Sequence, residues 1–129
     1  MKAPALFFGI GAASGAIAVA LGALAAHALR QQLAESAMHA FETGVHYQFL
    51  HALALCAVAL WIKSGEADAT THAVVAAWAF VAGTLMFSGS LYVLALGGPR
   101  WLGPITPIGG LALIFGWLAL AYGALRRAF

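Results

Sequence analysis

Residues 43–62 read TGVHYQFLHALALCAVALWI, a run of 20 positions without a charged side chain. A bilayer core about 30 Å thick needs roughly 20 helical residues to cross it, so this run predicts a transmembrane helix. Uncharged stretches at residues 3–29, 69–99 and 101–125 are also long enough to cross once and too short to cross twice. We therefore predict four transmembrane helices, near residues 4–26, 42–62, 73–96 and 105–125.

The composition excludes a soluble domain. Of 129 residues, 64% are hydrophobic and 8% are charged, whereas about a quarter of the residues are charged in a typical soluble domain. A folded soluble chain of about 150 residues buries only about 70% of its surface, which would leave much of this apolar surface in water. The continuous apolar runs also lack the alternation of barrel strands. The prediction is an all-α integral membrane protein, a compact bundle of four transmembrane helices with short loops, in which residues 1–129 form one domain.

The basic residues predict the orientation of the chain in the membrane. Lys and Arg near the ends of spans favour the cytoplasmic side. The two termini and the second loop share one side of a four-span protein, and the first and third loops share the other. The side with the termini carries four basic residues, Lys2, Lys63, Arg126 and Arg127. The side with the first and third loops carries two, Arg30 and Arg100. We therefore expect both termini in the cytoplasm.

Small residues recur at four-residue spacing in the first and fourth predicted helices. This spacing lets transmembrane backbones approach closely, because lipid tails are as apolar as leucine and helices associate mainly by packing. We predict close packing of the first helix through Gly11, Gly15 and Gly22, with the fourth helix, which contains Gly116, as its neighbour. Residues 27–41 fit either a short amphipathic helix at the outer interface or a helical extension of the second span.

Polar side chains gather in the outer half of the predicted spans. Such groups are costly in hydrocarbon unless they face the bundle and find partners, so their common depth predicts a shared polar pocket centred on His46 and His51. The candidate pocket residues are His27, Glu42, His46, Tyr47, Gln48, His51, Ser88, Ser90, Tyr92 and Thr106.

Several chemistries could use this pocket. His27, Glu42 and His46 offer imidazole and carboxylate ligands for zinc or another divalent ion, although their spacing is not a recognised metal signature. Histidines that bridge helices by hydrogen bonds are the structural alternative, and haem between His27 and His51 fits on ligand type alone. No complete set of acid, base and nucleophile is visible, which disfavours an enzyme. No cofactor is assigned.

The net charge of +2 comes from residues that flank the spans, which argues against a nucleic-acid partner.

Four blocks of the sequence resemble one family. Residues 22–27 (GALAAH), 41–54 (FETGVHYQFLHALA), 87–96 (FSGSLYVLAL) and 105–110 (ITPIGG) are similar to the YgdD/YwdK-like small bacterial inner-membrane proteins. The resemblance runs from about Leu6 to Leu125. The resemblance implies a four-span protein of the bacterial inner membrane in a family of unknown function. It identifies no catalytic residue in this sequence.

Three classes of function stay open. We favour a non-catalytic component that packs against membrane lipids and against itself or another membrane protein. The alternative is a binder or carrier of a small ligand, such as a metal ion, proton, quinone or lipid, that uses the outer polar residues. An enzyme acting on a lipid substrate is the least favoured.

Overall fold

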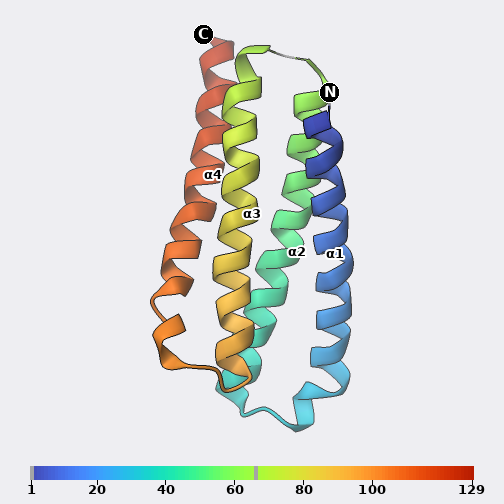
Figure 1. The fold of residues 1–129 in the computed structure, drawn as a ribbon, viewed down its shortest axis with the longest axis vertical. Coiled ribbons are helices and arrows are strands. Elements are labelled where there is room, and N and C mark those ends of the chain that lie inside the picture. The colour runs from blue at the N-terminus through green and yellow to red at the C-terminus, as the bar shows by residue number, and fades with distance from the viewer. Residues whose placement is uncertain (1, 66) are drawn as a thin grey trace.

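The computed structural model describes residues 2–65 and 67–129, with side chains described for residues 2–65 and 71–129. Four long helices run up and down: α1 (Lys2–His27), α2 (Glu35–Lys63), α3 (Ala67–Ala95) and α4 (Ile105–Ala128) (Figure 1). Short 3-10 turns, η1 (Leu29–Gln31) and η2 (Arg100–Leu102), precede α2 and α4. Each long helix is apolar and long enough to cross a membrane. The prediction of four helices is confirmed.

The largest difference from the predicted boundaries lies at the start of α2. This helix begins at Glu35, so within the segment of residues 27–41 the helical extension of the second span covers residues 35–41, and residues 29–31 form the η1 turn. Glu35 lies in the first turn, where a negative charge interacts favourably with the helix dipole. Met38 and Phe41 are buried against Leu29 of the η1 turn, and they close this end of the bundle with apolar contacts.

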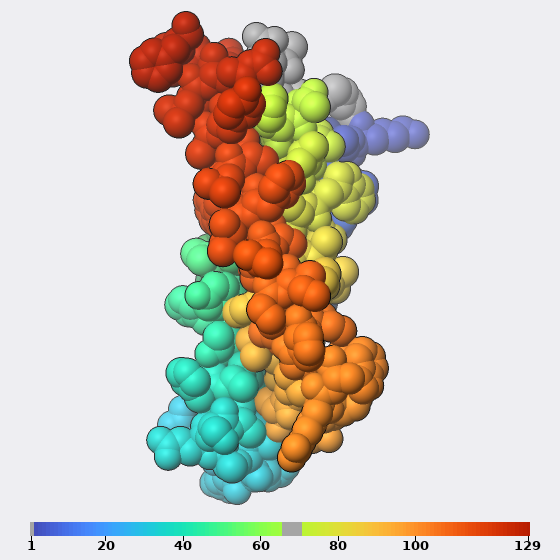
Figure 2. All heavy atoms as spheres, turned by 90° about the vertical axis from the view of Figure 1, so that its left-hand side faces the viewer, coloured from blue at the N-terminus to red at the C-terminus, as the bar shows by residue number. Residues whose placement is uncertain are grey.

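Helices that follow each other in the chain also lie side by side. The main packing pairs are α1 with α2, α2 with α3, and α3 with α4. Figure 1 shows α1 and α4 at opposite edges, so the prediction that they are neighbours is wrong. Short loops keep consecutive helices together, and lipid can cover the edge faces because it is as apolar as the helices. Seen from the α4 side, α4 lies in front, with side chains of α3 visible beside its upper half and side chains of α2 beside its lower half (Figure 2).

The α3–α4 interface pairs glycines with large side chains. A Cβ added to Gly116 would lie 2.7 Å from the Phe80 ring, and one added to Gly83 would lie 2.7 Å from the Leu113 side chain. Each helix therefore receives a large side chain of its partner over a glycine. At Gly109 the two backbones themselves meet, since a Cβ there would collide with the amide nitrogen of Phe87. Such close approach is what small residues permit in membranes.

The α1–α2 interface is closest at one of the three predicted glycines. A Cβ on Gly11 would lie 2.8 Å from the sulfur of Cys56, inside normal contact distance. At Gly15 and Gly22 the nearest α2 atoms would be 3.8 and 3.4 Å from an added Cβ, which is looser contact. Close packing of α1 thus depends most on Gly11, and its partner is α2.

The contrast between two adjacent glycines of α4 gives a stability test. Gly109→Ala should lower the free energy of unfolding by about 1–3 kcal/mol, because the new methyl group collides with backbone atoms of Met86 and Phe87. Gly110→Ala is the matched control, since its Cβ would lie 3.6 Å from the Phe87 ring and alanine favours the helix by about 1 kcal/mol. Reversible unfolding in mixed micelles measures both variants. Equal losses at the two positions would contradict the close approach at Gly109.

Candidate functional site

The described residues that are both polar and buried lie on α2 and α3. They are Gln48, His51, Ser88 and Ser90. All four belong to the predicted pocket. Because lipid provides no hydrogen-bond partners, each of them has to be satisfied within the protein.

Both ring nitrogens of His51 are hydrogen-bonded, one within α2 and the other to α4. Nδ1 lies 2.8 Å from the carbonyl oxygen of Tyr47, and Nε2 lies 3.0 Å from Nε1 of Trp117. A carbonyl only accepts and an indole N–H only donates, so Nδ1 carries the proton and Nε2 offers its lone pair. One neutral tautomer of His51 makes both hydrogen bonds. Neither nitrogen is then free to ligate a metal or haem iron.

Aromatic rings from α3 and α4 pack against His51. The centroid of its ring lies 5.3 Å from that of Phe80 on α3 and 5.9 Å from that of Trp117 on α4, both in edge-on orientations. Phe80 and Trp117 contact each other at 5.0 Å. Edge-to-face contacts of this kind are favourable beyond the area they bury. They surround the hydrogen-bonded imidazole with apolar atoms.

Gln48 connects α1, α2 and α3. Its Oε1 accepts a hydrogen bond from the Tyr92 hydroxyl at 2.6 Å, and its Nε2 donates to the backbone oxygen of Ser14 at 3.0 Å. Beside it, the Ser88 hydroxyl donates to the carbonyl oxygen of Gly44 at 2.7 Å. Both ends of the Gln48 amide are therefore used to join neighbouring helices.

Ser90 and Thr106 tie the end of α3 to the start of α4. Their hydroxyl oxygens lie 2.5 Å apart, and the Ser90 hydroxyl also donates to the carbonyl oxygen of Phe87 at 3.0 Å. The predicted pocket is thus divided into separate hydrogen-bonded groups around His51, Gln48 and Ser90.

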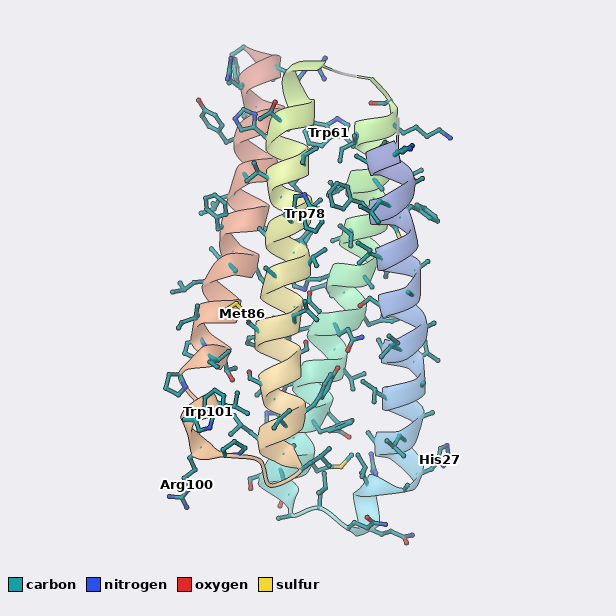
Figure 3. The ribbon with its side chains drawn as sticks, in the orientation of Figure 1. His27, Trp61, Trp78, Met86, Arg100 and Trp101 are labelled. Carbon is teal, nitrogen blue, oxygen red and sulfur yellow. The ribbon has the colours of Figure 1, made fainter. Side chains whose placement is uncertain are left out.

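The remaining predicted residues lie apart from these groups. His27 is exposed at the end of α1 and points away from the other helices (Figure 3). Glu42 is exposed and forms an ion pair with Arg30 at 3.5 Å. His46 is also exposed, with its ring edge-on to Tyr47 at 6.2 Å, so it is not a centre of the network as predicted.

The proposed metal ligands are not assembled in the described part of the chain. Within it, no group of three or more His, Cys, Asp or Glu side chains is placed to hold an ion. The carboxylate of Glu42 faces Arg30 instead of an imidazole.

Two partners in these groups were absent from the predicted set. Trp117 supplies the indole N–H for His51, and Ser14 supplies the carbonyl for Gln48. A tryptophan in an apolar span was a signal for the first, because an indole N–H within hydrocarbon needs an acceptor. No sequence signal identifies a backbone carbonyl as the second.

A cavity of about 500 Å³ lies between α1 and α3, over α2. Its walls are mostly apolar, and its polar lining residues include Ser14, Gln48, His51, Ser88 and Tyr92. Because the side chains of Gln48, His51, Ser88 and Tyr92 already bond to other protein groups, this α1–α3 cavity offers a mainly apolar environment.

Comparison with known proteins identifies the family. The family described as "Protein of unknown function (DUF423)" matches residues 21–110. The chain belongs to this family. This DUF423 protein is 38% identical over 123 residues to the UPF0382 membrane protein YwdK of Bacillus subtilis, and the match covers 94% of this chain and 97% of YwdK.

Other DUF423 relatives match over similar lengths. A UPF0382 membrane protein of Haemophilus influenzae is 43% identical over 115 residues, with 89% of this chain and 90% of the relative covered. The UPF0382 inner membrane protein YgdD of Escherichia coli is 38% identical over 121 residues, with 89% and 86% covered. No solved structure matches the chain. The resemblance to YgdD/YwdK-like proteins is confirmed, and the chain is a multi-pass inner-membrane protein with four candidate spans.

A double-mutant cycle measures the link between α2 and α4 in this DUF423 protein. His51→Leu and Trp117→Phe should show a coupling energy of about 0.6–1.7 kcal/mol, the range of hydrogen bonds buried in membrane proteins. The control pairs His51→Leu with Trp78→Phe, because Trp78 contacts Phe7 of α1 instead of the imidazole. Its coupling should stay below about 0.5 kcal/mol. Equal coupling in the two cycles, measured by unfolding in mixed micelles, would refute the His51–Trp117 bond.

Proposed function

We propose that this protein is a non-catalytic membrane component, in which the polar groups within the spans fix how the helices pack and the outer faces contact lipid and membrane partners. The observation that carries this proposal is that both ring nitrogens of His51 are engaged within the protein. A histidine that transfers protons or binds ions needs a nitrogen that can exchange its partner. His51 is instead bonded between two fixed groups of α2 and α4.

The other buried polar groups support the same function. The Gln48 amide bonds to Tyr92 and Ser14, and the Ser88 hydroxyl bonds to a backbone carbonyl. A nucleophilic serine is activated by an adjacent base, whereas the hydroxyl of Ser90 bonds to Thr106 and a carbonyl. Hydrogen bonds of this kind set the rotation and depth of each helix.

A small-ligand binder is the second candidate function. The α1–α3 cavity of about 500 Å³ favours it, because ligand pockets commonly measure about 300–1,000 Å³. The apolar walls would suit a lipid tail or a quinone better than an ion.

Two variants separate the candidate functions. His51→Leu should lower the melting temperature if the polar groups fix helix packing. Gly89→Leu should leave it unchanged while filling the α1–α3 cavity, since a Cβ there meets no atom within 4 Å. Thermal unfolding and native mass spectrometry of gently purified protein give the readouts. A small molecule that co-purifies with the wild type and is lost from Gly89→Leu would replace the first candidate by the second.

We propose that both termini face the cytoplasm. The termini and the α2–α3 connection lie at the same end of the bundle (Figure 1). Four of the six basic residues flank the spans at that end, as the positive-inside rule requires of the cytoplasmic side.

Single cysteines test this orientation. In a Cys56→Ala background, Gln32→Cys places an exposed thiol between α1 and α2, and Phe129→Cys places one at the carboxyl terminus. A maleimide that cannot cross membranes should label Gln32→Cys in intact cells and Phe129→Cys only after permeabilisation. The reverse pattern would invert the orientation.

A further inference from the structure

A groove between α1 and α2 lies at the end of the bundle that carries the termini. It has a volume of about 830 Å³, and its lining includes Pro4, Ala5, Phe8 and Gly9 of α1 together with Ala59 and Lys63 of α2. We call this surface the α1–α2 groove. It is separate from the α1–α3 cavity: Ala5 of the groove and Ser14 of the cavity are nine residues apart, which at about 100° per residue places them on opposite sides of α1.

The groove is hollow because its floor is made of small residues. A Cβ added to Gly9 would meet no atom within 4 Å, and Ala5 and Ala59 add little volume. Apolar walls do not hold ordered water, which needs two to four polar partners. An empty groove would also forfeit the dispersion contacts of its lining atoms. In a bilayer its natural filling is therefore a hydrocarbon chain.

A cation stands at the polar end of this groove. Lys63 is the last residue of α2, its side chain is exposed, and it lines the groove. Lysine near a helix end lays its methylene stem along apolar surface and extends its ammonium group to the membrane interface. Lys2 begins α1 two residues before Pro4 and adds a second exposed positive charge at this level. Apolar walls below a cation match the tail and phosphate of an anionic lipid.

At the opposite end of the same helix pair the cation is already paired within the protein, since Arg30 lies 3.5 Å from Glu42 and both line a hollow of about 900 Å³. A smaller hollow of about 370 Å³ lies there between α1 and α2, and its charged lining residue is Glu42. There the charges of Arg30 and Glu42 offset each other, so charge complementarity favours the end where Lys63 lines the groove.

We propose that the α1–α2 groove binds an anionic glycerophospholipid, with an acyl chain along Gly9 and the phosphate at Lys63. The site uses none of the hydrogen bonds of His51 or Gln48, so it does not rest on the function proposed above.

The test compares lipid retention by the purified full-length protein. Detergent-solubilised protein is mixed with equal amounts of phosphatidylglycerol and phosphatidylcholine, and bound lipid is counted by native mass spectrometry. The wild type should retain phosphatidylglycerol preferentially. Lys63→Gln should reduce that preference about fivefold, the effect of one basic residue on an anionic lipid. Arg126→Gln is the control, because Arg126 is an exposed basic residue of the last turn of α4, outside the groove.

Filling the groove tests the position of the acyl chain. Gly9→Leu, or Ala5→Leu if the first variant unfolds, should reduce retention of both lipids. Ala20→Leu is the control, since Ala20 is exposed on α1 and does not line the groove. Three results would each overturn the proposal. The wild type could retain the two lipids equally, Arg126→Gln could reduce the preference for phosphatidylglycerol as much as Lys63→Gln does, or the filled variants could bind lipid as well as the wild type. A wild-type dimer that Gly9→Leu dissociates would instead assign the groove to a second copy. Loss of a ligand from Gly89→Leu alone concerns the α1–α3 cavity and leaves this inference intact.

Discussion

Hydrocarbon cannot hydrogen-bond, and this constraint determines how the polar residues of the protein are used. The buried side chains of Gln48, His51, Ser88 and Ser90 find their partners on the same chain, whereas Nδ1 of His72 has none among the described residues. His51 finds Trp117 on α4, while Gln48 finds Tyr92 on α3 and Ser14 on α1. Because these partners come from all four helices, the bonds set the rotation and depth of each helix relative to the others. Their geometry accounts for the packing without any ligand.

The second determinant of the architecture is the close approach of neighbouring helices. Lipid is as apolar as the helix surfaces, so no hydrophobic effect drives the helices together and close packing has to hold them. Glycines such as Gly11 and Gly109 let helices that follow each other in the chain pack with little space between their backbones. Nothing forces the two edge helices to meet, since lipid solvates their outer faces as well as another helix would. The open arrangement leaves the α1–α3 cavity and the α1–α2 groove facing the membrane, and both are lined mainly by apolar side chains.

The sequence predicts the helices well because bilayer thickness imposes a length that uncharged runs reveal directly. It also identifies Gln48, His51, Ser88 and Ser90 as polar residues that must be paired. It does not reveal which helix supplies each partner, because periodicity defines the faces of a helix but not the neighbour of each face. For this reason the sequence did not predict that Trp117 of α4 donates the hydrogen bond to His51. The placement of α1 beside α4 failed for the same reason: small residues indicate close packing without naming the partner helix.

The central claim is that His51 is a neutral, doubly hydrogen-bonded link between α2 and α4. Nitrogen-15 NMR of the protein in lipid bilayers, with the His51 signals assigned through loss in His51→Leu, tests it most directly. The hydrogen bonds predict a protonated Nδ1 and an unprotonated Nε2 at neutral pH, with Nε2 correlated to the indole N–H of Trp117. A protonated Nε2, or an imidazole that exchanges between tautomers, would contradict the account.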